Sequence, residues 1–109
     1  MDFFHVCFLL SQACLGEIND NFKRIYFSMN GKQISLYFIL NDKSHEDEEV
    51  IRDEIMFEFS LLIDNFLEAS SIQNDYNINS KIFSTSQVEF FRTCPDKHDV
   101  FIEFYRRSA

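Results

Sequence analysis

Carboxylate side chains are the chemically active groups that stand closest together in this sequence of 109 residues. Ten of them lie between Asp42 and Glu68, where only Lys43 and Arg52 carry the opposite charge. This segment therefore holds a charge of −8, which equals the formal net charge of the whole chain. Carboxylates can transfer protons in a sheltered pocket, or they can attract a cationic partner.

The spacing of these carboxylates favours a cationic partner. Three like-charged pairs stand four residues apart, and each costs a helix about 0.2–0.5 kcal/mol. They are Glu49 with Asp53, Glu54 with Glu58, and Asp64 with Glu68. A surface that serves only solubility usually mixes its charges. A solvated helix face is the alternative to a partner. If the partner exists, the residues expected to contact it are Glu46, Asp47, Glu49, Asp53 and Glu54.

The other reactive residues indicate neither catalysis nor metal binding. An odd number of cysteines, Cys7, Cys14 and Cys94, favours free thiols in a reducing cytoplasm over a disulfide framework. The histidines have no other histidine or cysteine at metal-ligand spacing, so we expect no metal site. The sequence contains no glycine-rich phosphate loop and no catalytic serine or zinc motif. We therefore expect no enzyme and no cofactor.

The acidic balance also restricts the class of partner. An isoelectric point near 4.7 argues against direct binding of nucleic acid, because phosphates require a basic surface. It argues equally against docking on an anionic membrane. The apolar stretch near the N-terminus lacks a preceding basic region and is too short to cross a bilayer, so we expect neither a signal peptide nor a membrane helix.

The element that must present the carboxylates is predicted to be a helix. Ser44 is a good N-cap, and Asp47 takes the place of the usual Glu or Gln three residues later. One apolar face is predicted to be buried, with members at steps of four and three: Ile51, Ile55, Phe59, Leu62 and Phe66. The acids fall into two stripes beside that face: Glu46, Glu49, Asp53 and Asp64 in one, and Asp47, Glu54 and Glu58 in the other. Three apolar residues run between these acidic stripes and belong either to the core or to the centre of a contact surface: Val50, Phe57 and Leu61.

Two further elements are predicted ahead of the acidic helix. Asp2–Leu15 reads as a helix that is capped by Asp2 and ended by Gly16. Phe22–Leu40 reads as a β-hairpin around Asn30-Gly31, the residue pair that type I′ turns prefer. A two-residue loop at this pair would place Phe27 opposite Ile34 and Ile25 opposite Leu36. One face of the hairpin would cover the helices through Ile25, Phe27, Ile34, Leu36, Phe38 and Leu40.

The remainder of the chain has weaker patterns. We predict a loop over Ser70–Asn79, a strand within Asn77–Thr85, and a turn over Thr93–Asp99. Val88–Phe91 fits either a short strand or a helical turn. Val100–Arg107 is predicted to be a final strand, central in the sheet or partly covered, since apolar residues occur on both of its faces. The fold class is therefore α+β in a single domain over 1–109: a helix, an antiparallel hairpin, the acidic helix, and further strands that complete an antiparallel sheet packed on the helices.

Several stretches resemble one protein family. They are Leu9–Ile18, which reads LLSQACLGEI, then Asn21–Arg24, Asn41-Asp42, Ser44–Glu48 and the closing Tyr105–Arg107. Together they are similar to small bacterial immunity proteins of contact-dependent growth inhibition (CdiI-like) and of related polymorphic toxin systems. Asn19-Asp20 stands where prolines are expected in that pattern, and residues 69–99 match no part of it.

The resemblance implies a function. Such a protein would lie in the cytoplasm, as a monomer or homodimer, and would bind the C-terminal domain of its cognate toxin. That domain is commonly a nuclease with a basic cleft, and the inhibitor would mask the active site or an adjacent surface. A non-catalytic adaptor or subunit of a bacterial protein assembly is the alternative, with the apolar first helix as its contact surface. A small cytoplasmic enzyme is a third possibility.

Overall fold

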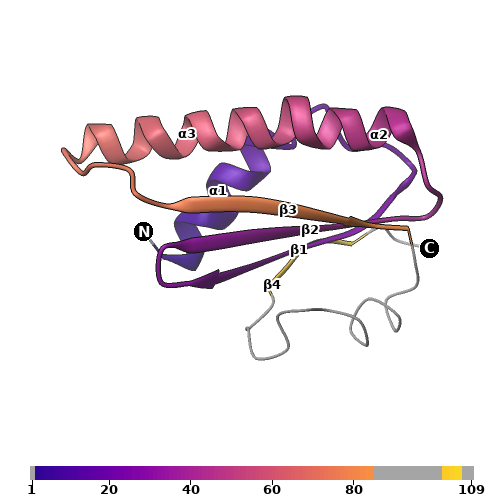
Figure 1. The fold of residues 1–109 in the computed structure, drawn as a ribbon, viewed down its shortest axis with the longest axis horizontal. Helices are drawn as coiled ribbons and strands as arrows, with labels where there is room; N and C mark the ends of the chain where they lie inside the picture. Colours follow the sequence, from indigo (N-terminus) through magenta and orange to yellow (C-terminus); the bar gives the residue numbers. More distant parts are fainter. Residues whose placement is uncertain (1, 85–101, 107–109) are drawn as a thin grey trace.

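The protein is described by a computed structural model over residues 2–84 and 102–106. Its elements follow in the order α1 (Phe3–Ala13), β1 (Phe22–Asn30), β2 (Gln33–Leu40), α2 (His45–Glu49), η1 (Val50–Ile55), α3 (Met56–Ala69), β3 (Asn77–Phe83) and β4 (Ile102–Arg106). The segments α2, η1 and α3 join end to end into one helical rod, which lies with α1 over one face of the sheet (Figure 1). The predicted α+β class and the order of its elements are confirmed.

The first helix begins as predicted. The side chain of Asp2 accepts a hydrogen bond of 2.9 Å from the backbone N–H of His5, which satisfies one of the free donors of the first turn. The helix ends at Ala13, with Cys14 as its C-cap. Gly16 then adopts a φ of 81°, a left-handed conformation that glycine takes without strain, and the chain turns toward β1.

The hairpin forms as predicted, but its turn lies one residue further along. Asn30 pairs with Gln33, so the two loop residues are Gly31 and Lys32. Gly31 has a φ of 61°, whereas Asn30 and Lys32 do not have positive φ values. This geometry fits a turn with glycine at the first central position, which is the type II′ preference rather than type I′. The register predicted from Asn30-Gly31 is therefore wrong.

The correction to the register leaves the buried face of the hairpin unchanged. Phe27 lies opposite Leu36 and Ile25 opposite Phe38, so each partner is shifted by two residues from the prediction. Because side chains alternate between the faces with a period of two, a shift of two residues keeps every side chain on its predicted face. All six residues predicted for the inner face are buried.

The rod contains a π-helical segment that sequence reasoning did not anticipate, Val50–Ile55. Ile51, Ile55 and Phe59 are buried as predicted, but the next buried positions are Ile63 and Leu67 rather than Leu62 and Phe66. In an α-helix a step of four residues advances about 40° past a full turn, so a line of such steps drifts around the axis. The predicted pattern corrected the drift with a three-residue step from Phe59 to Leu62. In the structure the π-helical turn, which holds more residues per turn, corrects it before Phe59, so the buried positions can continue in steps of four. Leu62 and Phe66 pack partly buried against the core.

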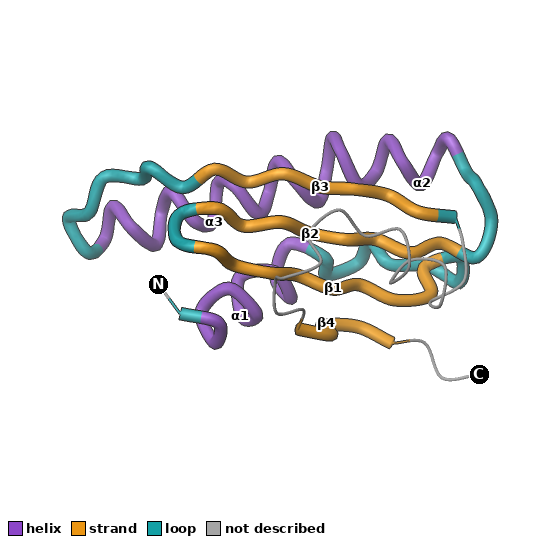
Figure 2. The backbone as a smooth tube through the Cα atoms, turned by 60° about the horizontal axis from the view of Figure 1, so that its bottom comes forward, coloured by secondary structure: helices purple, strands orange, loops and turns teal. Residues whose placement is uncertain are grey.

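The sheet is mixed rather than wholly antiparallel. The described residues form four strands in the order β3-β2-β1-β4, in which β4 is antiparallel to β1 and β3 is parallel to β2 (Figure 2). The rod carries the chain from the end of β2 back to the end of the sheet where β2 began, and the next strand must then run in the same direction as β2. The predicted strand within Asn77–Thr85 is present as β3.

The last part of the chain is described only in β4. Among the described strands, β4 lies at an edge of the sheet beside β1, so it is not central among them. The alternative, that this strand is partly covered, stays a prediction. The predictions for Val88–Phe91 and Thr93–Asp99 fall outside the described residues. In the part of the chain that the structure describes, no helix combines the length and the apolar character needed to cross a membrane.

The main core lies between the helices and the sheet. Fully burying one large apolar side chain contributes about 1.5–3 kcal/mol, so this layer holds α1 and the rod on the sheet. Its fully buried members include Leu10, Ile25, Phe27, Leu36, Phe38 and Phe59. The opposite face of the sheet is buried as well around Tyr26, Tyr37 and Ile39, which pack with Phe83.

Candidate functional site

The acidic helix predicted from the sequence corresponds to the helical rod, and it begins where the sequence indicated. The Ser44 hydroxyl accepts a hydrogen bond of 3.3 Å from the backbone N–H of Asp47. Glu46, Asp47 and Glu48 occupy the first turn, where the helix dipole favours negative charge. The rod therefore tolerates acids at its start, but the dipole offers no such compensation to Asp53 and Glu54, which lie further along.

Four of the five predicted contact residues line one hollow on the rod. This hollow, which we call the rod hollow, has a volume of about 260 Å³ and is lined by Glu46, Glu49, Val50, Asp53 and Glu54. All four acids are exposed, and Val50 is partly buried against the core. The hollow lies along the π-helical segment, a type of turn that frequently occurs at functional sites. We refer to Glu46, Glu49, Asp53 and Glu54 as the acidic surface.

The acidic surface is poorly neutralised within the described residues. Glu49 approaches the Nε2 atom of His45 at 3.0 Å, which is an ion pair only when the histidine is protonated. Arg52 instead faces Glu48, at 3.7 Å. Within the described ranges, Glu46, Asp53 and Glu54 have no ion pair, and no lysine or arginine lines the rod hollow.

Asp47, the fifth predicted contact residue, has a different environment. Asp47 is only 8% exposed. One carboxylate oxygen accepts a hydrogen bond of 2.7 Å from Asn19 Nδ2, and the other accepts one of 2.8 Å from Asn21 Nδ2. Burial alone raises the pKa of Asp47, but hydrogen bonds with Asn19, Asn21 and Ser44 act in the opposite direction and leave that pKa below its ordinary value. Asp47 thus holds the fold together at the start of the rod, and we leave it out of the acidic surface.

The hydrogen bonds around Asp47 connect three parts of the chain, and we call them the asparagine clasp. Asn21 Nδ2 also donates to the backbone carbonyl of Asp42 at 2.8 Å, and Asn21 Oδ1 accepts from the backbone N–H of Asp42 at 2.9 Å. Asn41 Nδ2 donates to the backbone carbonyl of Asp20 at 3.1 Å. The clasp ties the segment before β1 to the segment after β2 and to the rod. Asn21, Asn41-Asp42 and Asp47 all lie in the stretches that carry the family resemblance.

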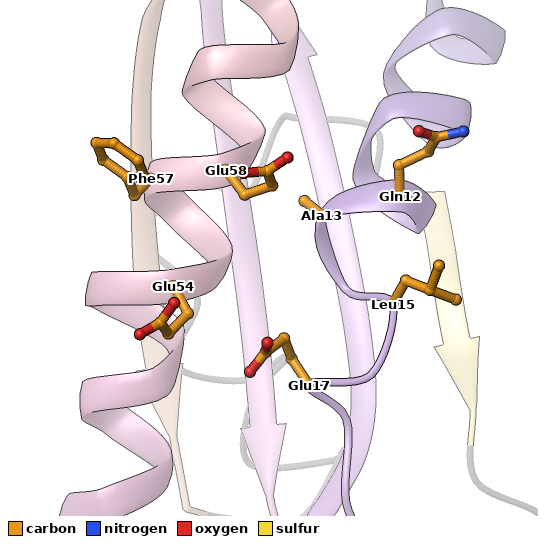
Figure 3. Close-up of a pocket in the computed structure, with 7 residues that line it drawn as sticks. All are labelled: Gln12, Ala13, Leu15, Glu17, Glu54, Phe57 and Glu58. Atoms are coloured by element: carbon orange, nitrogen blue, oxygen red, sulfur yellow. The ribbon is translucent and has the colours of Figure 1, made fainter.

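A second hollow lies beside the first, between the end of α1 and the rod. This interhelical hollow has a volume of about 380 Å³ and is lined by Gln12, Ala13, Leu15, Glu17, Glu54, Phe57 and Glu58. Glu58 extends from the rod toward α1, and Glu17 extends from the turn after α1 toward the rod (Figure 3). Glu54 lines both hollows. Sequence reasoning missed the contribution of Leu15 and Glu17, because only the tertiary packing brings the turn after α1 beside the rod.

The three apolar residues between the acidic stripes divide into two groups. Val50 packs partly buried against the core. Phe57 is 66% exposed and Leu61 is 43% exposed. The interpretation as core therefore holds in part for Val50 and fails for Phe57 and Leu61, which the rod presents to solvent among its acids.

Metal-ligating and nucleophilic side chains are also present among the described residues. Among the residues that the structure describes, no group of three or more His, Cys, Asp or Glu side chains could hold a metal ion. Cys7 and Cys14 are free thiols, and Cys94 lies outside the described residues. Burial raises the pKa of the Cys14 thiol to about 12, so this group stays protonated and unreactive near neutral pH.

Comparison with protein families identifies the family of the chain. Residues 5–93 match the family described as MafI2 immunity protein, a range that includes most of α1, the hairpin, the whole rod and β3. The chain belongs to the MafI2 immunity protein family. Comparison with curated proteins finds no similar sequence.

Membership of the MafI2 family confirms the broader part of the predicted function. The chain is an immunity protein of a polymorphic toxin system, and such a protein has a toxin as its partner. The resemblance predicts a more specific kind of system than the family match shows, namely contact-dependent growth inhibition. The match supports the wider group of polymorphic toxin systems and not that particular member.

Proposed function

We propose that this MafI2 family member binds its cognate toxin domain through the acidic surface and neutralises the toxin by covering its active site or a surface beside it. The observation that carries the proposal is the rod hollow, where four exposed carboxylates gather around Val50 without a lysine or arginine among the residues lining it. Such a concentration of one charge opposes folding slightly, and a cationic partner removes the repulsion when it binds.

The charge of the acidic surface favours a nuclease as the toxin. A nuclease must hold phosphates, and phosphate groups are bound by lysine and arginine side chains. Carboxylates that project from one side of a helix can occupy the positions of those phosphates. We therefore propose that the partner presents a basic cleft, and that the acidic surface enters it or blocks its entrance.

We further propose that the chain acts by binding alone. A carboxylate that works as a general acid needs shelter from water to raise its pKa, whereas the acidic surface is exposed. The free thiols of Cys7 and Cys14 are consistent with action in the cytoplasm, where the toxin would be met after delivery from a neighbouring cell.

Co-expression with the cognate toxin domain tests the proposal. The wild-type chain should rescue growth and purify together with the toxin domain. A Glu49→Lys/Asp53→Lys double variant should rescue growth less well. The matched control is Asp64→Lys/Glu68→Lys, which changes the net charge equally, on the same rod, at a pair with the same spacing outside both hollows. Equal rescue by the two variants would remove the acidic surface from the mechanism.

A subunit of a larger assembly is the second candidate, and the surface of α1 favours it. Phe4 and Phe8 are exposed one turn apart on this helix. If they formed a permanent subunit contact, the isolated chain would self-associate beyond a dimer in light scattering. A monomer or a dimer at micromolar concentration is the result that the immunity function predicts.

A further inference from the structure

Large apolar side chains are exposed on both sides of the interhelical hollow. Leu15 is 83% exposed and Phe57 is 66% exposed, and the two side chains point outward on opposite sides of the hollow (Figure 3). A single exposed apolar residue is ordinary on a protein surface. Leu15 and Phe57 flank a hollow of about 380 Å³ whose other lining residues are mostly polar, so a partner that entered the hollow would meet an apolar side chain on either side.

The charge of the interhelical hollow restricts what can cover this surface. Glu17 and Glu58 extend into the hollow from opposite walls (Figure 3). In the part of the chain that the structure describes, neither carboxylate has an ion pair, and no basic side chain lines the hollow. A cation placed between the two carboxylates would be attracted by both and would relieve their mutual repulsion.

We infer that the interhelical hollow seats an arginine of the toxin, with the guanidinium between Glu17 and Glu58 and with apolar neighbours of that arginine covering Phe57 and Leu15. The inference rests on the proposed function and extends the toxin-binding surface from the rod to the turn after α1. The bound segment is therefore basic at its centre and apolar at its flanks.

Arginine fits this hollow better than lysine does. Its planar guanidinium presents five N–H donors and can bond to two carboxylates at once, whereas an ammonium group is a compact and strongly hydrated charge. The flanking contacts at Phe57 and Leu15 exclude water from the ion pairs, and pairs that are shielded in this way interact more strongly. Phe57 also offers an aromatic ring to a cation on its own side of the rod.

The two hollows then differ in their kinetic roles. Exposed charges such as the acidic surface mainly accelerate encounter with an oppositely charged partner. Well-packed central groups mainly determine how slowly the complex dissociates. The interhelical hollow is therefore expected to control the dissociation rate, whereas the rod hollow is expected to control the association rate.

Surface plasmon resonance with the cognate toxin domain separates these roles. Phe57→Ala, and separately Glu17→Gln/Glu58→Gln, should each raise the dissociation rate at least about tenfold and change the association rate far less. Ile72→Ala is the matched control, because Ile72 is 50% exposed but does not line the interhelical hollow. Its dissociation rate should equal that of the wild type. Melting temperatures close to the wild-type value would show that the exposed positions were altered without loss of the fold.

The outcomes distinguish this inference from the proposed function. If Phe57→Ala and Glu17→Gln/Glu58→Gln leave the dissociation rate within twofold of wild type, the inference is wrong, while the acidic surface can still bind the toxin. An equal effect of Ile72→Ala would also contradict it. If the wild-type chain does not bind the toxin domain, the proposed function itself fails.

Photo-crosslinking identifies the residue that the hollow seats. With p-benzoylphenylalanine in place of Phe57, ultraviolet light should join the chain to a toxin peptide that contains an arginine. Replacement of that arginine by lysine should then raise the dissociation rate, and Glu17→Gln/Glu58→Gln should reduce the difference between the two toxin variants. A crosslinked peptide without a basic residue would overturn the inference.

Discussion

Replacement of Asp47 by asparagine tests whether this acid stabilises the fold rather than contacting the toxin. The change keeps the size of the side chain and removes its charge. Asp47 accepts hydrogen bonds from Asn19 Nδ2 and Asn21 Nδ2 through its two carboxylate oxygens. An asparagine can accept only one of them, and its own NH₂ group then faces the second donor.

The magnitude follows from the two hydrogen bonds that the substitution affects. A hydrogen bond to a charged group contributes about 1.5–3 kcal/mol, and a neutral one about 0.5–1.5 kcal/mol. The variant loses one hydrogen bond to a charged group and turns the second into a weaker, neutral hydrogen bond. The free energy of unfolding should therefore fall by about 2–4 kcal/mol. Asp53→Asn is the control, because Asp53 is an exposed acid on the same rod without a hydrogen-bond partner among the described residues.

Urea denaturation followed by circular dichroism measures this difference and its dependence on pH. The pKa of Asp47 in the folded protein lies below the ordinary value. Its charged form therefore contributes stability that is complete above the ordinary pKa of about 4 and is lost as the pH falls through the lowered value. The gap in unfolding free energy between wild type and Asp47→Asn should be largest near pH 7 and should shrink in strong acid.

Two results would contradict this reasoning. A gap below about 0.5 kcal/mol at pH 7 would show that the asparagine clasp does not stabilise the start of the rod. A gap of the same size at pH 7 and in strong acid would show that the charge of Asp47 is not the cause.

The turn and the buried thiol give two further predictions. Gly31→Val should lower the free energy of unfolding by about 1–2 kcal/mol in urea denaturation, because Gly31 has a φ of 61° that a β-branched residue adopts only with strain; no change would refute the turn geometry. Cys14 should resist iodoacetamide in the native protein near pH 8, because burial raises its pKa to about 12, and should react once the protein is unfolded. Peptide mass spectrometry measures the labelling, and rapid native labelling of Cys14 would contradict its burial.

The elements and buried faces could be predicted from local patterns. Capping residues identified the starts of α1 and of the rod, and alternation of apolar residues identified the inner face of the hairpin. The register of the hairpin was predicted wrongly because either Asn30-Gly31 or Gly31-Lys32 can form a two-residue turn. The pattern of buried residues does not distinguish them, because both choices bury the same face. The buried positions near the end of the rod were predicted wrongly because a pattern that assumes α-helical spacing does not reveal the π-helical segment.

The candidate site could be predicted only in part, for a related reason. Glu46, Glu49, Asp53 and Glu54 share one hollow because they lie on one continuous helix, where spacing alone determines the face. Asp47 looked equivalent in the sequence, but its burial depends on Asn19 and Asn21, which approach it only through the tertiary fold. The interhelical hollow likewise depends on the packing of α1 against the rod. β3 is parallel to β2 because the rod acts as a crossover between them. The prediction of an antiparallel sheet considered the later strands without this crossover.

The salt dependence of toxin association tests the central claim most directly. Stopped-flow measurements over a range of ionic strength should show that Glu49→Lys/Asp53→Lys lowers the association rate about tenfold at low salt and flattens its salt dependence. The matched control Asp64→Lys/Glu68→Lys should keep most of the wild-type rate and salt slope. If both double variants associate with the same rate and the same salt slope, the acidic surface does not guide the toxin, and the account given for this immunity protein is contradicted.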